Sequence, residues 1–271
     1  MRLAVTVPPA DAERALAEAC AALGSGCREA ETPDGAARLD FWVPEAAADP
    51  DRLAALLARA GIAARVEALA QDDGWRDAMR AFHLPVEIGG ILLVRPPWAP
   101  ARPPLHDVVV EPGMAFGTAQ HATTRTCLEL LSGLPDRERG GSLLDAGCGS
   151  GVLAIAARRL GFDPVWALDR DPLAVEATIR NARRNRVGLR VARRAIGADG
   201  LPAADVVLAN LTGGLLRDLA GALSEPAPRA LVASGIRPEE APGVEETMAR
   251  RGLAASWRVE DEGWTTLLFE P

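Results

Sequence analysis

The 271-residue chain contains no lysine and no tyrosine, so arginine supplies all 30 of its lysine-or-arginine positions. Without a side-chain amine, the chain can neither form a Schiff base nor use a lysine as general base. Its four cysteines form no C-x-x-C pair, and His83, His106 and His121 are scattered without metal-ligand spacing. No charged-then-apolar leader precedes the first residues. We therefore predict no metal site and a protein of the reduced cytoplasm.

The sequence also lacks a long apolar run and an excess of positive charge. No run approaches the roughly 20 apolar residues that a helix needs to cross a bilayer, so we expect no membrane association. The net charge is -7. Binding of a nucleic-acid backbone requires clustered cations, so direct nucleic-acid binding is not expected. A chain with a negative net charge suits a basic partner protein better. The oligomeric state is left open.

The first 70 residues follow the order strand, helix, strand, strand, helix, strand. "RLAVTVP" and "ARLDFWVP" alternate like half-buried strands, and "IAARVEALA" is strand-like. Two helices are indicated by apolar spacing and by an aspartate at the start, Asp11 for "AERALAEACAALG" and Asp49 before Pro50 for the second. This order predicts a ferredoxin-like α+β domain over residues 1–70. Because that fold serves many functions, it names none.

Residues 71–105 are interpreted as a connecting region. A short helix carries Trp75 and Phe82, the strand-like "GGILLVRPP" follows, and "WAPARPPLHD" is rich in proline. Closely spaced prolines stiffen and extend a chain, so we place the domain boundary in this last stretch.

Residues 106–271 alternate apolar strands with helix-like segments. The strands are "SLLDAG", "PVWALD", "LRVARRA", "ADVVLANL" and "RALVASGI". Such alternation predicts a doubly wound, mostly parallel sheet that is covered by helices on both faces. Near the end, "AASWRVEDEGWTTLLFE" indicates two strands that form an antiparallel edge hairpin.

A glycine-rich turn follows the first of these strands. The strand ends at Asp145, the glycines Gly147, Gly149 and Gly151 come next, and a helix begins. Backbone N–H groups at such a turn lie at the carboxyl edge of the sheet, where open α/β folds bind ligands. Asp169 ends the next strand, at the spacing where a carboxylate binds the hydroxyls of a ribose. Both nucleotide cofactors and S-adenosylmethionine contain that ribose.

Two details favour S-adenosylmethionine over a dinucleotide. The turn reads G-x-G-x-G, one residue shorter than the dinucleotide signature, and Asp145 would repel a pyrophosphate but stabilise a ligand that carries an ammonium and a sulfonium. The strand "ADVVLAN" also presents Asn210 at the same edge of the sheet. The alternative is that these residues merely cap helices. Three such strand ends in succession favour the cofactor site.

Four segments resemble the PrmA family, which methylates protein eleven of the large ribosomal subunit. They are "DAGCGSGVLAIAARRLG", "ALDRDPLAVEATIRNARRN", "ADVVLANLTGGLLRDLA" and, most specific of all, "EPGMAFGTAQHATTRTCLELL". The similarity runs over residues 75–264 and is densest over 111–220. The resemblance implies a seven-stranded, Rossmann-like class I methyltransferase sheet that binds S-adenosylmethionine, and a small N-terminal domain that docks the ribosomal protein.

The resemblance also implies roles for single residues. Thr124, the second threonine of the H-x-T-T segment, and Gly147 contact the cofactor, and Asp169 binds its ribose. Asn210 is the family's asparagine at the end of the fourth strand, and we take it as the catalytic residue, whose oxygen accepts a hydrogen bond from the substrate amine and orients it. The predicted cofactor-binding residues are Phe116, Thr124, Gly147, Gly149, Gly151, Asp169 and Asn210.

Some residues near the H-x-T-T segment admit two interpretations. Phe116 either covers the cofactor or substrate, or anchors its loop. His121 either acts as a base or hydrogen-bonds to its own backbone, and Trp264 either packs in the rim or contacts the substrate; in both cases the structural role is favoured. The family usually has a glycine and a proline where this chain has Ala119 and Ala122.

The predicted function is therefore methylation of lysine side-chain and α-amino nitrogens of a large-subunit ribosomal protein. One alternative is a methyltransferase of the same fold that acts on another protein's lysine or glutamine, or on nucleic-acid amines. Another is a non-catalytic, ribosome-associated binding module. The sequence does not indicate which lysines are modified or how many methyl groups are added.

Overall fold

The computed structural model describes residues 1–23, 27–32, 35–43, 48–69, 83–112, 117, 119–135, 140–198 and 200–271. Contacts divide the chain into two compact units, Met1–Met79 and Arg80–Pro271. Across these described ranges, no helix combines the length and the apolar character that a membrane span requires.

The first unit is a four-stranded antiparallel sheet with two helices. Its strand order is β2-β3-β1-β4. The elements are β1 (Arg2–Val7), α1 (Ala12–Leu23), β2 (Cys27–Glu31), β3 (Ala37–Trp42), α2 (Pro50–Arg59) and β4 (Arg65–Leu69). Alternate strand residues such as Leu3, Val5 and Phe41 are fully buried in one core with Leu53 and Leu57 of α2. The predicted ferredoxin-like fold is confirmed.

The two helices of this unit begin differently. Asp49 caps α2 as predicted, because its carboxylate accepts a hydrogen bond from the backbone nitrogen of Arg52 at 2.9 Å. Asp11 does not act as the predicted cap of α1. It lies in a 3₁₀ turn, Pro9–Asp11, which runs directly into the helix, and its carboxylate accepts instead from the guanidinium of Arg14 at 3.1 Å.

The second unit begins with a small three-stranded sheet. Its strands are β5 (Val86–Ile88), β6 (Leu92–Arg95) and β7 (His106–Val109), in that order. The proline-rich stretch 96–105, where we placed the domain boundary, connects β6 to β7 within this unit, and these two strands pair in parallel. At the edge of β7, the Asn185 side chain accepts from the Val109 nitrogen at 2.8 Å and donates to its oxygen at 2.7 Å.

A seven-stranded sheet forms the body of the second unit. Its order is β10-β9-β8-β11-β12-β14-β13, and only β14 runs antiparallel to its two neighbours. The strands are β8 (Leu143–Ala146), β9 (Val165–Asp169), β10 (Arg190–Arg193), β11 (Val206–Asn210), β12 (Ala230–Ile236), β13 (Ala254–Asp261) and β14 (Trp264–Glu270). The helices are α4 (Ala122–Gly133), α5 (Val152–Arg159), α6 (Pro172–Asn185), α7 (Gly213–Ala222) and α8 (Ala241–Ala249). The predicted mostly parallel sheet and the C-terminal antiparallel hairpin are both confirmed.

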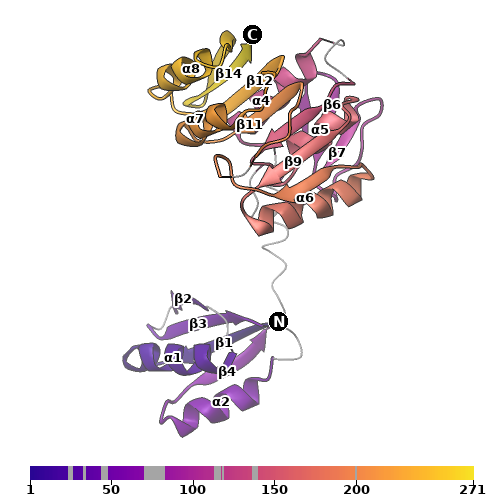
Figure 1. The fold of residues 1–271 in the computed structure, drawn as a ribbon. Helices are drawn as coiled ribbons and strands as arrows, with labels where there is room; N and C mark the ends of the chain where they lie inside the picture. The colour runs from indigo at the N-terminus through magenta and orange to yellow at the C-terminus, as the bar shows by residue number, and fades with distance from the viewer. Residues whose placement is uncertain are drawn as a thin grey trace. The chain divides into compact units, whose positions relative to one another are not determined.

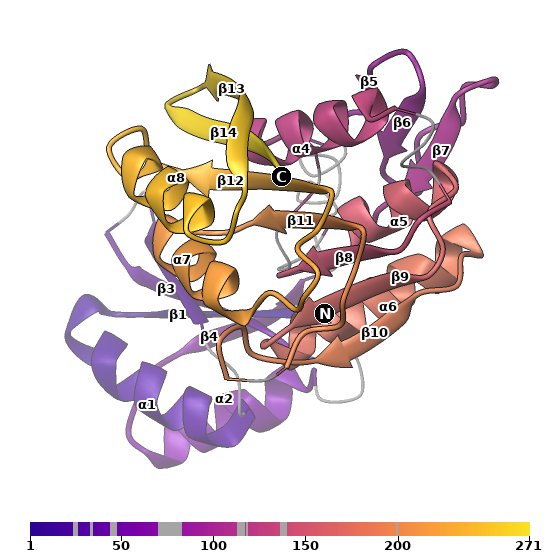
Figure 2. The same cartoon turned by 45° about the horizontal axis from the view of Figure 1, so that its top comes forward.

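Both faces of this sheet are buried, which explains why its strands are continuously apolar. Leu143 and Val206 point into a core with α4 and α5, while their neighbours Leu144 and Val207 point into a second core with α7 and α8. Figures 1 and 2 show α7 and α8 on one side of the sheet and α4, α5 and α6 on the other. Because β8, β9, β11 and β12 are parallel, their carboxyl ends meet at one edge.

Candidate active site

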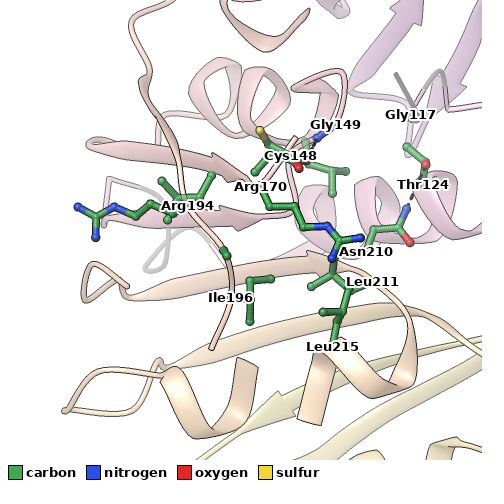
Figure 3. A pocket seen from close by; sticks show the side chains of 15 residues that line it. Gly117, Thr124, Cys148, Gly149, Arg170, Arg194, Ile196, Asn210, Leu211 and Leu215 are labelled. Carbon is green, nitrogen blue, oxygen red and sulfur yellow. Dashed lines mark hydrogen bonds between the residues drawn. The ribbon is translucent and has the colours of Figure 1, made fainter. Parts of the chain in front are cut away.

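The carboxyl ends of β8, β9 and β11 surround a cavity of about 280 Å³. Figure 3 shows Thr124 and Asn210 at one end of the cavity and Arg194 at the other, with the Arg170 side chain extending between them. The lining residues are Gly117, Thr124, Gly147, Cys148, Gly149, Leu153, Leu168, Asp169, Arg170, Arg194, Ala195, Ile196, Asn210, Leu211 and Leu215. The cavity is therefore polar along the strand ends and apolar at Ile196, Leu211 and Leu215.

The glycine turn requires glycine for two reasons. Gly147, Gly149 and Gly151 have φ of 82°, 53° and 81°, in the left-handed region that other residues rarely adopt. A Cβ on Gly147 would also lie 2.5 Å from Cδ2 of Leu211, so this cavity-lining side chain would have to move. The turn is held to β9, because the nitrogens of Gly147 and Cys148 donate to the Leu168 oxygen at 2.8 and 3.0 Å.

Asp169 is fixed in place by two backbone groups. Its Oδ2 accepts from the nitrogen of Gly149 at 3.0 Å, and its Oδ1 accepts from the nitrogen of Asp171 at 2.9 Å. A carboxylate oxygen accepts more than one hydrogen bond, so both oxygens keep acceptor capacity toward the cavity. The carboxylate is thus oriented before any ligand arrives.

Asn210 is held by the first turn of α4. Its Nδ2 donates to the hydroxyl oxygens of Thr123 at 3.1 Å and Thr124 at 3.3 Å. Since the two hydroxyls occupy the amide nitrogen, the amide oxygen Oδ1 is left as an acceptor, and it makes no hydrogen bond within the described part of the chain. Oδ1 lies beside Gly235, where a Cβ would approach it to 3.1 Å. The alternative interpretation, a helix-capping asparagine, does not describe this side chain.

Asp145 lies beneath the glycine turn and is completely buried. Its Oδ2 accepts from the nitrogen of Ala154 at 3.1 Å, whereas its Oδ1 has no hydrogen-bond partner among the described residues. Burial raises the pKa of Asp145 to about 7, the bond from Ala154 opposes that rise, and the nearby Asp169 adds to it. A positively charged ligand nearby would offset this cost of burial.

A second group of side chains continues from Asn210 away from the cavity. The His121 ring nitrogen Nδ1 lies 2.8 Å from the Thr123 hydroxyl and caps α4, which confirms the predicted backbone role of this histidine. The His121 ring meets Trp264 edge to face at 5.5 Å, and the guanidinium of Arg237 lies 4.1 Å above the Trp264 ring. Trp264, expected to pack in the rim, is thus linked to Asn210 through Thr123 and His121.

At both departures from the family pattern, the backbone geometry fits the residue that the family usually has there. Ala119 has a φ of 63°, a conformation that glycine adopts freely and that costs alanine about 1 kcal/mol. Ala122 is the first residue of α4, the position in a helix where proline is most readily accepted. The structure therefore requires at these places the conformations that a glycine and a proline supply.

The cavity brings together five of the seven predicted cofactor-binding residues, namely Thr124, Gly147, Gly149, Asp169 and Asn210. Gly151 caps α5 and packs against Thr178 instead of lining the cavity. Phe116 lies outside the described residues. The individual roles of these seven residues stay predictions. Within the ranges that the structure describes, no group of three or more acidic, histidine or cysteine side chains is placed to hold a metal.

Several lining residues were not identified from the sequence. Arg170 directly follows Asp169, the last residue of β9. Its position at a strand end is therefore a signal that the sequence does contain. Ile196 and Leu211 carry no polar group that signals a ligand, and Arg194 follows a strand that ends without a glycine turn, aspartate or asparagine. Thr123 shares the contact with Asn210 with its neighbour Thr124, which the family resemblance indicates alone.

The strand order, with the antiparallel β14 beside β12, is that of the class I methyltransferase sheet. The sequence resemblance implied this sheet. Such a sheet binds its ligand at the carboxyl ends of the strands on either side of the point where the order reverses. Here that point lies between β8 and β11, where the cavity is found.

The chain belongs to the family described as ribosomal protein L11 methyltransferase (PrmA), whose sequence model matches residues 46–270. It is 38% identical over 253 residues to the ribosomal protein L11 methyltransferase of Pelotomaculum thermopropionicum, covering 88% of this chain and 81% of that protein. It is 41% identical over 207 residues to that of Methylococcus capsulatus, covering 74% and 69%. A crystal structure of ribosomal protein L11 methylase from Lactobacillus delbrueckii subsp. bulgaricus superposes with a TM-score of 0.61 at 25% identity, covering 69% of this chain and 97% of that one.

Proposed function

We propose that this protein transfers methyl groups from S-adenosylmethionine to lysine side-chain and α-amino nitrogens of ribosomal protein L11. The observation that carries the proposal is the convergence of Asp169 and Asn210 on one cavity in a member of this family. A ribosomal protein substrate implies a cytoplasmic setting. Residues 1–70 are proposed as the domain that recognises the substrate.

The residues of the cavity fit the cofactor. Asp169 would bind the ribose hydroxyls, the glycine turn and Thr124 would surround the methionine end, and the apolar lining would contact the adenine. The buried and unpartnered Oδ1 of Asp145 favours a cationic ligand near the turn. Arg170 and Arg194 also line the cavity, but both are exposed, so their charges are better screened than that of Asp145.

The cofactor supplies a methyl group that is already activated by the positive sulfur. The protein must therefore bring a neutral amine close to that methyl group and align it. Asn210 suits this task, since Thr123 and Thr124 fix its amide and leave Oδ1 to accept a hydrogen bond from the amine. That bond would direct the amine's lone pair away from the asparagine and toward the methyl group.

The direct test uses purified L11 and isotopically labelled S-adenosylmethionine, with the label located by mass spectrometry. We expect label on lysine and α-amino nitrogens. Asn210→Ala is expected to lower the rate of transfer by about 100-fold, the loss typical of a misaligned reactant. Cofactor affinity measured by calorimetry is expected to change little.

A matched pair of variants separates alignment from packing. Thr123→Val removes one of the two hydroxyls that hold the Asn210 amide and keeps the volume, while Thr123→Ser keeps that hydroxyl. The valine variant should be slow and the serine variant close to wild type. Transfer at the wild-type rate by Asn210→Ala would exclude the proposed role of Asn210. Label on a glutamine of L11, or no label on L11, would exclude the proposed acceptor nitrogens.

A further inference from the structure

One face of Trp264 is covered by a cation that the protein itself supplies. The guanidinium of Arg237 lies 4.1 Å from the centre of the Trp264 ring. The two residues face each other because β12 and β14 are antiparallel, with Ile236 opposite Thr265, so Arg237 and Trp264 are the next pair in that register. Arg237 is exposed, and its side chain makes no hydrogen bond or ion pair within the described part of the chain. Its guanidinium is therefore positioned there by the stacking on Trp264.

The covered ring is connected to the proposed position of the substrate amine. Asn210 contacts Thr123, Thr123 contacts His121, and the His121 ring contacts Trp264. Gly235, two residues before Arg237, lies beside Oδ1 of Asn210. Asn210 ends β11, and Arg237 directly follows the end of the neighbouring β12, so both lie at the carboxyl edge of the sheet.

An aromatic face attracts any cation, and quaternary ammonium groups such as methylated lysine bind to aromatic side chains in this way. Both the protonated substrate and a methylated product are cations of this kind. An uncovered Trp264, which Thr123 and His121 connect to Asn210, would attract the amine in its charged form, which cannot attack, and would also retain the product. A neutral amine gains less from the ring, because the attraction acts on full positive charge.

We propose that Arg237 is a specificity-determining residue that occupies the face of Trp264 and so competes with substrate and product ammonium groups for it. The guanidinium would exclude the charged forms and leave Asn210 to select the neutral amine. This inference rests on the proposed function, since it takes the acceptor to be an amine.

A binding measurement tests the inference without methyl transfer. The probe is the amide of acetyl-Nε-trimethyl-lysine, titrated by calorimetry into protein saturated with S-adenosylhomocysteine. Arg237→Ala is expected to bind the probe about two- to fivefold more tightly than wild type, which is the worth of one exposed cation–π contact. Arg237→Gln should show the same gain with less change of volume. The uncharged analogue with carbon in place of the nitrogen should bind all variants alike.

Two further variants show whether Trp264 is responsible. In Arg237→Ala combined with Trp264→Leu the gain should vanish, because the aromatic face is gone. Arg190→Ala is the matched control, since Arg190 stacks on Trp166 at 4.8 Å elsewhere in the sheet, and it should leave probe binding unchanged.

Unchanged or weaker probe binding by both Arg237 variants would overturn the inference, and weaker binding would indicate that Arg237 merely supports Trp264. Transfer to L11 by the wild-type protein is measured separately. A failure of the proposed function therefore appears in the transfer assay, while a failure of this inference appears in the binding assay.

Discussion

Replacing Asp145 by asparagine should stabilise the protein increasingly as the pH rises. The pKa of this carboxyl is raised from 3.8 to about 7, chiefly by burial. Because the folded pKa is above the unfolded one, the unfolded state loses its proton first. The stability of the wild-type protein therefore falls as the pH rises from about 4 to about 7, and the loss is complete above the folded pKa.

The magnitude follows from the shift. A shift from 3.8 to about 7 corresponds to about 4 kcal/mol at full ionisation. About 2 kcal/mol of this cost is already present at about pH 5, so the advantage of Asp145→Asn should grow by about 2–3 kcal/mol between about pH 5 and about pH 8. The amide oxygen can still accept from Ala154, as Oδ2 does in the wild type. Constant effects of the substitution cancel in this comparison.

Urea denaturation of both proteins at several pH values measures this difference. Hydrogen exchange of the peptide that contains residues 143–146 shows which unfolding transition belongs to the seven-stranded sheet. Asp205→Asn is the control: hydrogen bonds from Ser142 lower the pKa of Asp205, so its contribution is lost only as the pH falls through that lowered value. The Asp205 difference should stay flat between about pH 5 and about pH 8. An equally flat Asp145 difference would refute the reasoning.

Three other outcomes are expected. Gly147→Ala should weaken cofactor binding, because its Cβ would lie 2.5 Å from Cδ2 of Leu211 and would force this cavity-lining side chain to move. Gly140→Ala, with φ of 88° and open space around it, should lose about 1–2 kcal/mol of stability and keep its affinity. Calorimetry and melting compare the two variants, and equal affinities would contradict the steric argument. Deletion of residues 1–70 should preserve cofactor binding and abolish methylation of L11, so full activity of the shortened protein would exclude a recognition role. Cofactor binding at about pH 6.5 should release protons, because a cationic ligand lowers the raised pKa of Asp145; calorimetry in buffers of different ionisation enthalpy measures the release, and identical heats would contradict it.

The sequence predicted the features that depend on local pattern. Strand ends, the glycine turn and the spacing to Asp169 follow from residues close together in the chain, so the place of the cavity in the sheet follows from the sequence alone. The resemblance to a family added the strand order, and it also implies a role for Asn210 that stays a prediction. The predicted place of the cavity is correct because parallel strands necessarily bring their carboxyl ends to one edge.

The sequence did not predict features that depend on register and on distant partners. The hydrogen bond from Asn210 to the Thr123 hydroxyl joins residues that are 87 positions apart. The Arg237 and Trp264 pair exists only because β12 and β14 align Ile236 with Thr265. A shift of one residue in that pairing would turn the two side chains to other neighbours, and no local pattern fixes it.

The contact between Asn185 and the Val109 backbone has a consequence for solubility. β7 is an edge strand, and an open edge is a template on which another chain can add a strand. Here one side-chain amide offers Val109 both the acceptor and the donor that a neighbouring strand would provide. At Val109, the outer edge of β7 therefore has its backbone nitrogen and oxygen hydrogen-bonded instead of unpaired. Replacing Asn185 by an apolar residue would leave the backbone nitrogen and oxygen of Val109 without these two partners.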